Sequence, residues 1–342
     1  MKNSTKMSDE EERSYDLIPS YDPASVVAVV VTYNRKDLLQ GCLKALFAQS
    51  HPLKGIVLVD NASTDNTIEF LIDSSYITKC PSFENKKRWE ETNQIFPAGL
   101  SLTYIRLYEN EGGSGGFHEG LKRAMRENCD WFWILDDDVE PEKDCLENLL
   151  KFNSISKCIH PRKFLMDGTP LEWEGYLDIK TGQRVFLPDP SFKKGFNFST
   201  TNTGCFEGML VHREIVEKIG FPDKRFFIFG DDSIYGFMAS FHTAVLYTKD
   251  AHIKKIKFPD KKNPMISDRS IYYGMRNRFL FLNLINKKVP KYRYSRLFFL
   301  FLKFLDYSSN IFHSRKNDRI RGYLILLRAV KDGLIGKFGK GI

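Results

Sequence analysis

The chain has 342 residues, enough to bury a large core, so we expect one large domain with an appendage. Its hydrophobic fraction of 42% and charged fraction of 27% are typical of a globular protein. The net charge of +8 predicts an anionic partner, which could be a nucleotide, a nucleic acid or a membrane surface. The six cysteines contain no CxxC pair and no metal-ligand spacing, a pattern that favours a reducing cytosol over a disulfide framework.

Residues 1–23 are polar and rich in acids, and they lack the basic start and apolar centre of a signal peptide. We therefore expect a flexible N-terminal arm. No window of the sequence reaches the roughly 18 consecutive apolar residues that a membrane-spanning helix needs. These features predict a cytoplasmic protein without a membrane span.

Two strand–helix pairs open the folded part of the sequence. Residues 26–31 and 55–59 are apolar runs rich in β-branched side chains, which are typical of buried strands. Apolar residues between 39 and 47 recur at helical spacing, and the cap-type residues 63–65 begin a second helix. The alternation of strands and helices predicts a parallel sheet with right-handed crossovers.

Residues 77–99 are less regular, and the basic run 86–88 followed by Trp89 resembles an exposed insertion. A third apolar strand, residues 102–107, then leads into a glycine-rich run at residues 110–116. Glycines between a strand and a helix let the backbone approach a ligand and offer free N–H groups to anions. A tight turn without any ligand is the alternative. The run matches neither the dinucleotide fingerprint nor the phosphate-binding P-loop.

Three consecutive carboxylates, Asp136, Asp137 and Asp138, end the bulky apolar run that begins at Trp131. Because open α/β sheets bind ligands at the carboxyl ends of their strands, this pattern predicts a metal–phosphate site. The alternative is a solvated acidic turn. The acids also match the spacing of a calcium-binding loop, but Pro141 stands where that loop needs glycine, so we exclude it.

The second half of the chain offers isolated candidates for a site. Trp173, next to Glu174, could stack on a sugar ring or be a core residue. Asp231 and Asp232 precede residues at helical spacing, so an aspartate there could simply cap a helix. His252 follows a predicted strand, where a lone histidine is usually structural or solvated.

The C-terminal part combines aromatic-rich apolar runs, residues 278–282 and 296–305, with many lysines and arginines. Helices of this composition can lie on an anionic membrane surface, or they can form a subdomain that packs on the core. No recognition motif accompanies the basic residues, so we do not expect nucleic-acid binding.

Several of these segments, taken together, resemble family 2 glycosyltransferases with the GT-A fold in order, spacing and residue type. The glycine run and the triple aspartate look most like the galactofuranosyltransferase and rhamnosyltransferase branch. The resemblance covers about residues 24 to 280. It is carried by residues 30–35, 59–65, 110–116, 135–138, 226–232 and 272–277.

This resemblance implies an α/β fold with a mixed, mostly parallel central sheet flanked by helices, followed by a C-terminal helical region. We expect a catalytic domain over residues 24–264, in which residues 24–140 bind the nucleotide-sugar and residues 141–264 bind the acceptor. Residues 265–342 then form the helical, basic and aromatic region.

The family pattern, carried over residue by residue, assigns roles to positions of this chain. Asp232 is expected to be the general base, Asp231 to contact the acceptor together with Trp173 and Glu174, and Asp60 to accept from the N–H of a uracil or thymine ring. Asp136, Asp138 and His252 are expected to bind Mn²⁺ or Mg²⁺. The predicted nucleotide-sugar contacts are Thr32, Tyr33, Asn34, Arg35, Asp60, Asn61, Asn110, Gly112, Gly113, Gly116, Asp136 and Asp137.

The resulting hypothesis is an inverting, metal-dependent glycosyltransferase that works at the inner face of the cell membrane. It would transfer galactofuranose from a UDP donor to a lipid-linked surface polysaccharide. Two alternatives stay open at this point: a rhamnosyltransferase that uses a dTDP donor, and a non-catalytic nucleotide-sugar-binding or membrane scaffold subunit.

Overall fold

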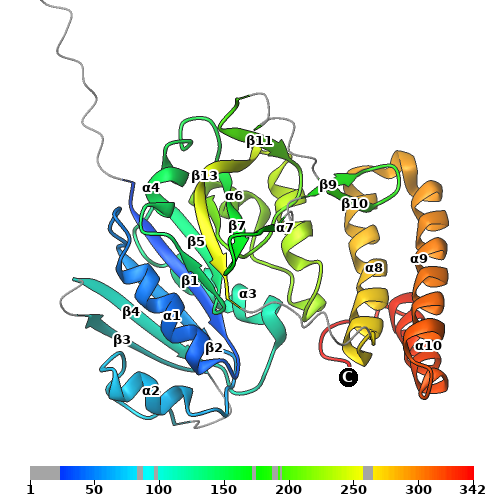
Figure 1. Cartoon of the computed structure of the whole chain (residues 1–342), viewed down its shortest axis with the longest axis horizontal. Coiled ribbons are helices and arrows are strands. Elements are labelled where there is room, and N and C mark those ends of the chain that lie inside the picture. The colour runs from blue at the N-terminus through cyan, green and yellow to red at the C-terminus, as the bar shows by residue number, and fades with distance from the viewer. Residues whose placement is uncertain are drawn as a thin grey trace, which may run out of the picture.

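The computed structural model describes residues 24–82, 88–95, 99–171, 175–186, 192, 195–256 and 265–342. Its centre is a twisted sheet with helices on both faces, and a separate group of three long helices stands beside it (Figure 1). Within the described residues this sheet has eleven strands, nine of them in the order β11-β13-β7-β12-β5-β1-β2-β4-β3. The predicted fold class, a mixed and mostly parallel sheet with a C-terminal helical region, is confirmed.

Four parallel strands form the N-terminal half of the sheet: β1 (Val26–Thr32), β2 (Gly55–Asp60), β4 (Leu100–Arg106) and β5 (Trp131–Asp136). Their residues are almost continuously apolar because helices cover both faces. Since the strands run in one direction, their polar last residues meet at one edge of the sheet.

The two faces of β1 show how the helices are placed. Val26, Ala28 and Val30 pack toward α1 (Lys36–Phe47) and its neighbours, whereas the alternate valines pack toward the helices of the opposite face. The remaining helices of the first face are α2 (Thr67–Asp73) and α4 (Cys145–Leu150). Those of the second face are α3 (Gly112–Ala124), α6 (Arg213–Ile219) and α7 (Asp231–Ala239).

The C-terminal half of the sheet mixes parallel and antiparallel strands. The strand β12 (Met209–His212) pairs antiparallel with β5, and β13 (Val245–Lys255) runs parallel to β7 (Cys158–Leu165). The other strands are β6 (Val139–Pro141), β8 (Pro170–Leu171) and β11 (Phe198–Thr201) in the sheet, and the hairpin of β9 (Gly175–Asp178) and β10 (Gln183–Phe186) outside it.

The three C-terminal helices are α8 (Asp268–Lys288), α9 (Arg293–Ser314) and α10 (Arg319–Leu334), and a short turn η3 (Pro290–Tyr292) joins the first two. The helix α8 lies nearest the sheet domain, and α9 lies on its far side (Figure 1). Residues of α8, such as Phe281, share a buried apolar cluster with Phe237 of α7. No helix of the described residues is long and apolar enough to cross a membrane.

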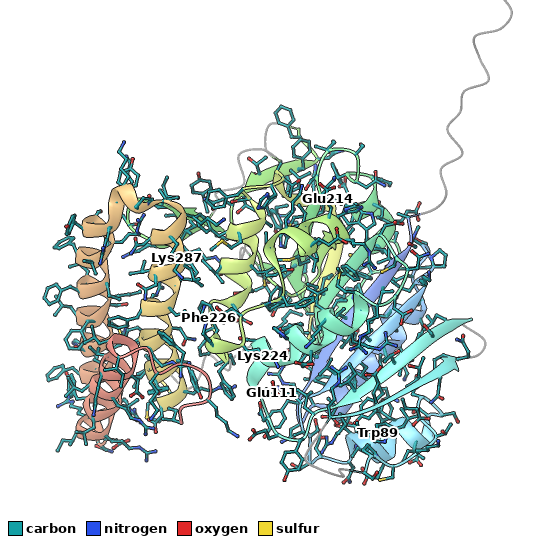
Figure 2. All side chains as sticks on the ribbon, turned by 180° about the vertical axis from the view of Figure 1, so that it is seen from behind. Trp89, Glu111, Glu214, Lys224, Phe226 and Lys287 are labelled. Atoms are coloured by element: carbon teal, nitrogen blue, oxygen red, sulfur yellow. The ribbon has the colours of Figure 1, made fainter. Side chains whose placement is uncertain are left out.

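A short turn, η2 (Lys224–Phe226), connects the helices around α3 to this C-terminal group. Lys224 forms ion pairs with Glu111 at 3.0 Å and Glu119 at 2.5 Å, and Figure 2 shows Lys224 between Glu111 and Phe226. Phe226 is fully buried and belongs to the cluster that contains Phe281. The segment before α7 is thus fixed from both sides.

Two expectations about the elements were wrong. The segment 77–99, expected to lack regular structure, includes an edge strand, β3 (Trp89–Ile95), which pairs antiparallel with β4. The glycine run is not a loop, because α3 already begins at Gly112.

Candidate active site

A cavity of about 1150 Å³ lies at the edge where β1 and β5 end. Its floor is formed by Thr32 to Arg35 and by Asp136 to Asp138, and its far wall by the start of α7 and by α8. An open α/β sheet binds its ligands at this edge. The cavity brings together most of the predicted site residues: Thr32, Tyr33, Asn34, Arg35, Asn61, Asn110, Gly112, Gly113, Asp136, Asp137, Asp138, Asp231 and Asp232.

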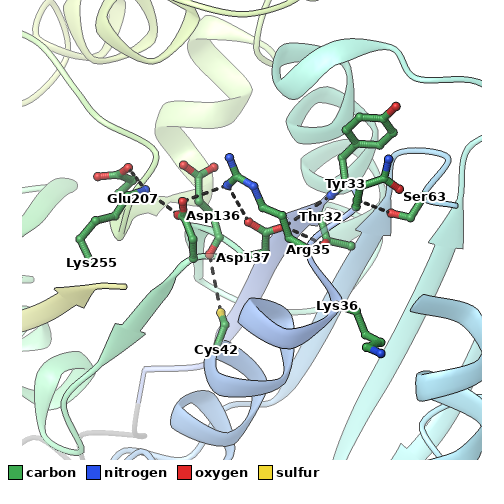
Figure 3. Close-up of polar contacts among 12 residues, drawn as sticks. Thr32, Tyr33, Arg35, Lys36, Cys42, Ser63, Asp136, Asp137, Glu207 and Lys255 are labelled. Carbon is green, nitrogen blue, oxygen red and sulfur yellow. Dashed lines mark hydrogen bonds and ion pairs between the residues drawn. The ribbon is translucent and has the colours of Figure 1, made fainter. Parts of the chain in front are cut away.

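Asp137 ties the end of β5 to the loop after β1. Its carboxylate accepts from the Thr32 hydroxyl at 2.7 Å and from Arg35 at 3.1 Å, and Arg35 also reaches Asp138 at 2.9 Å (Figure 3). Burial raises the pKa of Asp137 to about 6, although Arg35 and Thr32 oppose that shift. Asp137 therefore shapes the floor of the cavity through hydrogen bonds within the protein.

An acidic cluster consists of Asp136, Asp138 and Glu207, whose carboxylate oxygens lie within 4.8 Å of one another. Burial raises the pKa of Asp136 well above its usual range, and the neighbouring carboxylates add to this shift. Lys255 forms ion pairs with Asp138 and Glu207, each at 2.5 Å. The oxygen atoms suit a divalent cation such as Mg²⁺ or Mn²⁺.

His252 does not join this cluster, contrary to our expectation. One of its ring nitrogens lies 3.2 Å from Glu142, the other lies 2.9 Å from the Lys249 carbonyl, and the ring packs against Phe164. His252 and Lys255 are three residues apart on β13, so alternation places their side chains on opposite faces of the sheet. Glu207 offers the third oxygen ligand instead.

Asp60 also lies away from the expected position. It is fully buried and accepts from Tyr104 at 2.7 Å, from Arg106 at 2.5 Å and from the Ser63 backbone N–H at 2.7 Å. Asp60 does not line the cavity. These contacts hold the ends of β2 and β4 together around the buried Asp60 carboxylate. Its placement does not support the expected contact with a nucleotide base.

The residue after it, Asn61, does line the cavity. Its amide donates to the Gly112 carbonyl at 2.8 Å and its carbonyl accepts from the Glu111 backbone N–H at 2.9 Å. Gly112 has a φ of +77°, and a Cβ there would lie 2.0 Å from the Phe227 carbonyl oxygen. Only glycine fits this approach, which brings the start of α3 against the segment before α7.

Gly116 is buried in α3 and packs against Val31, so the structure places it behind the cavity rather than in its lining. Trp173 and Glu174 lie outside the described residues.

The first two residues of α7, Asp231 and Asp232, face the cavity from the side opposite β1. Asp231 is buried, and this burial together with the adjacent Asp232 raises its pKa to about 7. Asp232 is more exposed and accepts from the Ser233 backbone N–H at 2.6 Å. Of the two, Asp232 is the more accessible acceptor for a proton from a bound ligand.

Asn277 of α8 holds the segment that leads into these aspartates. Its side-chain amide donates to the carbonyls of Phe226, Ile228 and Phe229, at 2.9, 2.6 and 3.0 Å. Phe229 has a φ of +69°, a conformation that non-glycine residues adopt rarely and that needs such support. The C-terminal helices therefore position one wall of the cavity.

Several residues that line the cavity were not predicted from the sequence. Glu207 could have been noticed as a single acid within the apolar run before β12, and Lys255 would have required the full length of β13. The missed residues are Arg184, Glu207, Lys255, Arg269, Asn277, Arg278 and Tyr307.

An open α/β sheet with an acidic cluster at its carboxyl edge and a second acidic pair across the cavity defines a ligand-binding protein of the nucleotide-binding α/β class. The chain belongs to glycosyl transferase family 2, whose family model matches residues 27–77 and 84–220.

Curated relatives agree with this family. The chain is 25% identical over 225 residues to galactofuranosyltransferase GlfT1 of Mycolicibacterium smegmatis, an alignment that covers 60% of this chain and 62% of the relative. It is 25% identical over 204 residues to the putative teichuronic acid biosynthesis glycosyltransferase TuaG of Bacillus subtilis, covering 58% of this chain and 67% of that protein. The chain thus spans somewhat less than two thirds of the length of GlfT1.

Solved structures show the same GT-A fold. S. aureus TarS 1-349 in complex with UDP-GlcNAc superposes with a TM-score of 0.54 at 16% identity, covering 90% of this chain and 80% of that one. The mannosyltransferase PcManGT from Pyrobaculum calidifontis, in complex with GDP-Man and Mn²⁺, gives a TM-score of 0.51 at 15% identity, covering 93% and 89%. At these identities the likeness concerns the fold.

Proposed function

We propose that this protein is an inverting glycosyltransferase that transfers galactofuranose from UDP-galactofuranose to a hydroxyl group of a lipid-linked surface glycan. Membership of glycosyl transferase family 2 and the similarity to galactofuranosyltransferase GlfT1 support the reaction class and the donor. The observation that carries the proposal is the cavity, whose lining includes both the acidic end of β5 and the two aspartates of α7.

The proposed reaction is a single displacement that needs one general base. The acceptor oxygen attacks the anomeric carbon, the bond from that carbon to the diphosphate oxygen breaks, and the hydroxyl proton passes to the Asp232 carboxylate. Asp232 lies at the N-terminus of α7 and is more exposed than Asp231, so its carboxylate is accessible to the acceptor hydroxyl. A single displacement of this kind inverts the anomeric configuration.

The reaction also requires that the negative charge that develops on the leaving group be offset. Asp136, Asp138 and Glu207 offer oxygen atoms that would hold Mn²⁺ or Mg²⁺, and such an ion would offset the charge that develops on the departing diphosphate. On the other side of the cluster, Arg35 holds Asp137 and Asp138 in place.

Membrane contact through the C-terminal helices would bring a lipid-linked acceptor to the cavity. Exposed apolar side chains on α9 recur at helical spacing and form a stripe, called here the apolar face of α9, and a similar stripe runs along α10. The apolar face of α9 consists of Tyr294, Leu297, Phe298, Phe301, Leu305 and Phe312. Lysines and arginines near both ends of α9 would contact anionic headgroups.

A transfer assay with UDP-galactofuranose tests the reaction. The Asp232→Asn variant should lose about two to four orders of magnitude in kcat, because a general base contributes that much. Asp250→Asn is the matched control, since Asp250 is exposed on β13 and does not line the cavity. Full transfer activity in Asp232→Asn would show that the base is misassigned.

The donor is tested separately by measuring thermal stabilisation with a panel of UDP- and dTDP-sugars. UDP-galactofuranose should raise the melting temperature more than a dTDP-sugar does. Stabilisation by dTDP-rhamnose alone would replace the proposed donor, and no stabilisation by any nucleotide-sugar would contradict the enzyme assignment.

A further inference from the structure

Lys255 stands inside the acidic cluster. Its side chain is 6% exposed, and its amino group lies 2.5 Å from an oxygen of Asp138 and 2.5 Å from an oxygen of Glu207. Figure 3 shows this amino group beside the Glu207 carboxylate, with Asp136 next to them. These are the same carboxylates that offer ligands to a divalent ion. An ammonium group and a metal ion therefore have to share one set of oxygen atoms.

The position of Lys255 is fixed by the sheet. Its backbone pairs with Val139 of β6 on one side and with Leu165 of β7 on the other. Since the Cα atom cannot move without breaking both pairings, the ammonium group can leave the cluster only by rotation of its side chain. Lys255 lines the cavity, so that rotation has space available.

With the Lys255 ammonium group in place, the carboxylate oxygens of the acidic cluster are not equally supplied with hydrogen-bond partners. The second carboxylate oxygen of Glu207 is buried and, among the described residues, has no hydrogen-bond partner. Asp138, by contrast, has a cation on each oxygen, Lys255 on one and Arg35 on the other. A buried carboxylate oxygen without a partner is costly, so Glu207 is prepared to accept a further ligand.

We propose that Lys255 is an internal competitor of the divalent ion: its ammonium group neutralises the acidic cluster in the free protein, and the ion enters only when that group swings out into the cavity. The inference deepens the proposed function, because it concerns how the proposed metal site is loaded. In this arrangement Lys255 lowers the affinity for the ion and stabilises the cluster while no ion is bound.

Direct measurement of Mn²⁺ binding tests the proposal without donor, acceptor or transfer. The free-ion signal in electron paramagnetic resonance gives the Kd for the full chain, for Lys255→Gln and for Lys254→Gln. Lys255→Gln removes the charge but keeps a hydrogen-bond donor. Lys254→Gln is the matched control, because Lys254 neighbours Lys255 on β13, is exposed and pairs with Glu142 outside the cluster.

The Kd of Lys255→Gln should be at least about tenfold lower than that of the full chain, whereas Lys254→Gln should bind unchanged. Asp136→Asn in the Lys255→Gln background should abolish the gain, which places the ion in the cluster. Lys255→Arg, which keeps the charge, should bind no more tightly than the unmodified chain and serves as a second variant if Lys255→Gln fails to fold. Equal or weaker binding by a folded Lys255→Gln variant overturns the proposal.

Because these measurements use neither donor nor acceptor, their outcome is independent of the transfer assay. Loss of transfer in Asp232→Asn with unchanged Mn²⁺ binding in Lys255→Gln would refute the competition and leave the reaction in place.

Discussion

At the scale of single residues, the strand ends at the carboxyl edge of the sheet depend on buried charges that are paired within the protein. Asp60 and Arg106 are the clearest case. The Asp60 side chain is 0% exposed and that of Arg106 is 10% exposed, and their charged atoms lie 2.5 Å apart. Arg106 also donates to the Ser63 carbonyl at 2.6 Å, so one guanidinium group holds the turn that leads from β2 toward α2.

We predict that Arg106→Met lowers the free energy of unfolding by about 3–5 kcal/mol, because it leaves the Asp60 carboxylate buried without its cation. Urea unfolding measures this change. Lys157→Met is the control, since Lys157 pairs with Glu214 at the surface, where ion pairs contribute about 0–1 kcal/mol. A loss below about 1 kcal/mol in Arg106→Met would contradict the prediction and show that this buried ion pair contributes no more than a surface pair.

At the scale of elements, β7 carries a histidine whose environment excludes the charged form. His160 is fully buried; its Nδ1 faces the Leu246 carbonyl at 3.2 Å and its Nε2 accepts from the Cys205 backbone N–H at 3.4 Å. Burial, followed by the charge of Lys163, lowers the pKa of His160 to about 3. The imidazole therefore stays neutral in the fold while it titrates normally in the unfolded chain.

This difference predicts a loss of stability in mild acid. The unfolded chain binds a proton at His160 below about pH 6.5 and the folded protein does not, so His160 by itself should lower the free energy of unfolding by about 1.4 kcal/mol for each pH unit below that value, measured as the difference from His160→Gln. Chemical denaturation at pH 7.0, 6.0 and 5.0 measures the slope. His160→Gln, although less stable at pH 7, should show a shallower slope, and equal slopes for both proteins would contradict the prediction.

The parallel strands could be predicted from the sequence because burial on two faces demands continuous apolar runs. The edge strand β3 could not, since an edge is solvated on one side and its residues, from Trp89 to Ile95, are mostly polar. The start of α3 was obscured by its glycines, which are poor helix formers. They are present because Gly112 and Gly116 touch Phe227 and Val31 closely.

The site was predictable where chemistry follows directly from local sequence, as in Asp136 to Asp138 and in the pair that begins α7. It was not predictable where the register of a strand decides which side chain faces the cavity. His252 and Lys255 differ by three positions on β13, and only the pairing of that strand assigns the inner face to the lysine. Asn277 acts through the backbone of residues 226–229, a contact that no local pattern encodes.

At the scale of the whole molecule, the three C-terminal helices have two structural roles. Their inner side supports the segment before α7 through Asn277 and the cluster of Phe281, and their outer side exposes apolar residues beside basic ones. Leu297, Phe298 and Phe301 are 48%, 57% and 55% exposed on α9, which a helix packed only on its own domain would not require. Under the proposed function, this surface would hold the cavity near a membrane.

We predict that the double variant Phe298→Ser/Phe301→Ser binds anionic vesicles at least several-fold more weakly, because both rings would enter the headgroup region of a bilayer. Co-sedimentation with phosphatidylglycerol-containing vesicles measures the bound fraction, and raised salt should weaken the binding of the unmodified protein by screening the basic residues. Phe241→Ser is the control, since Phe241 is 46% exposed at the end of α7, outside the apolar face of α9. Transfer to a water-soluble acceptor should be unchanged in the double variant, and undiminished vesicle binding would show that α9 does not contact the membrane.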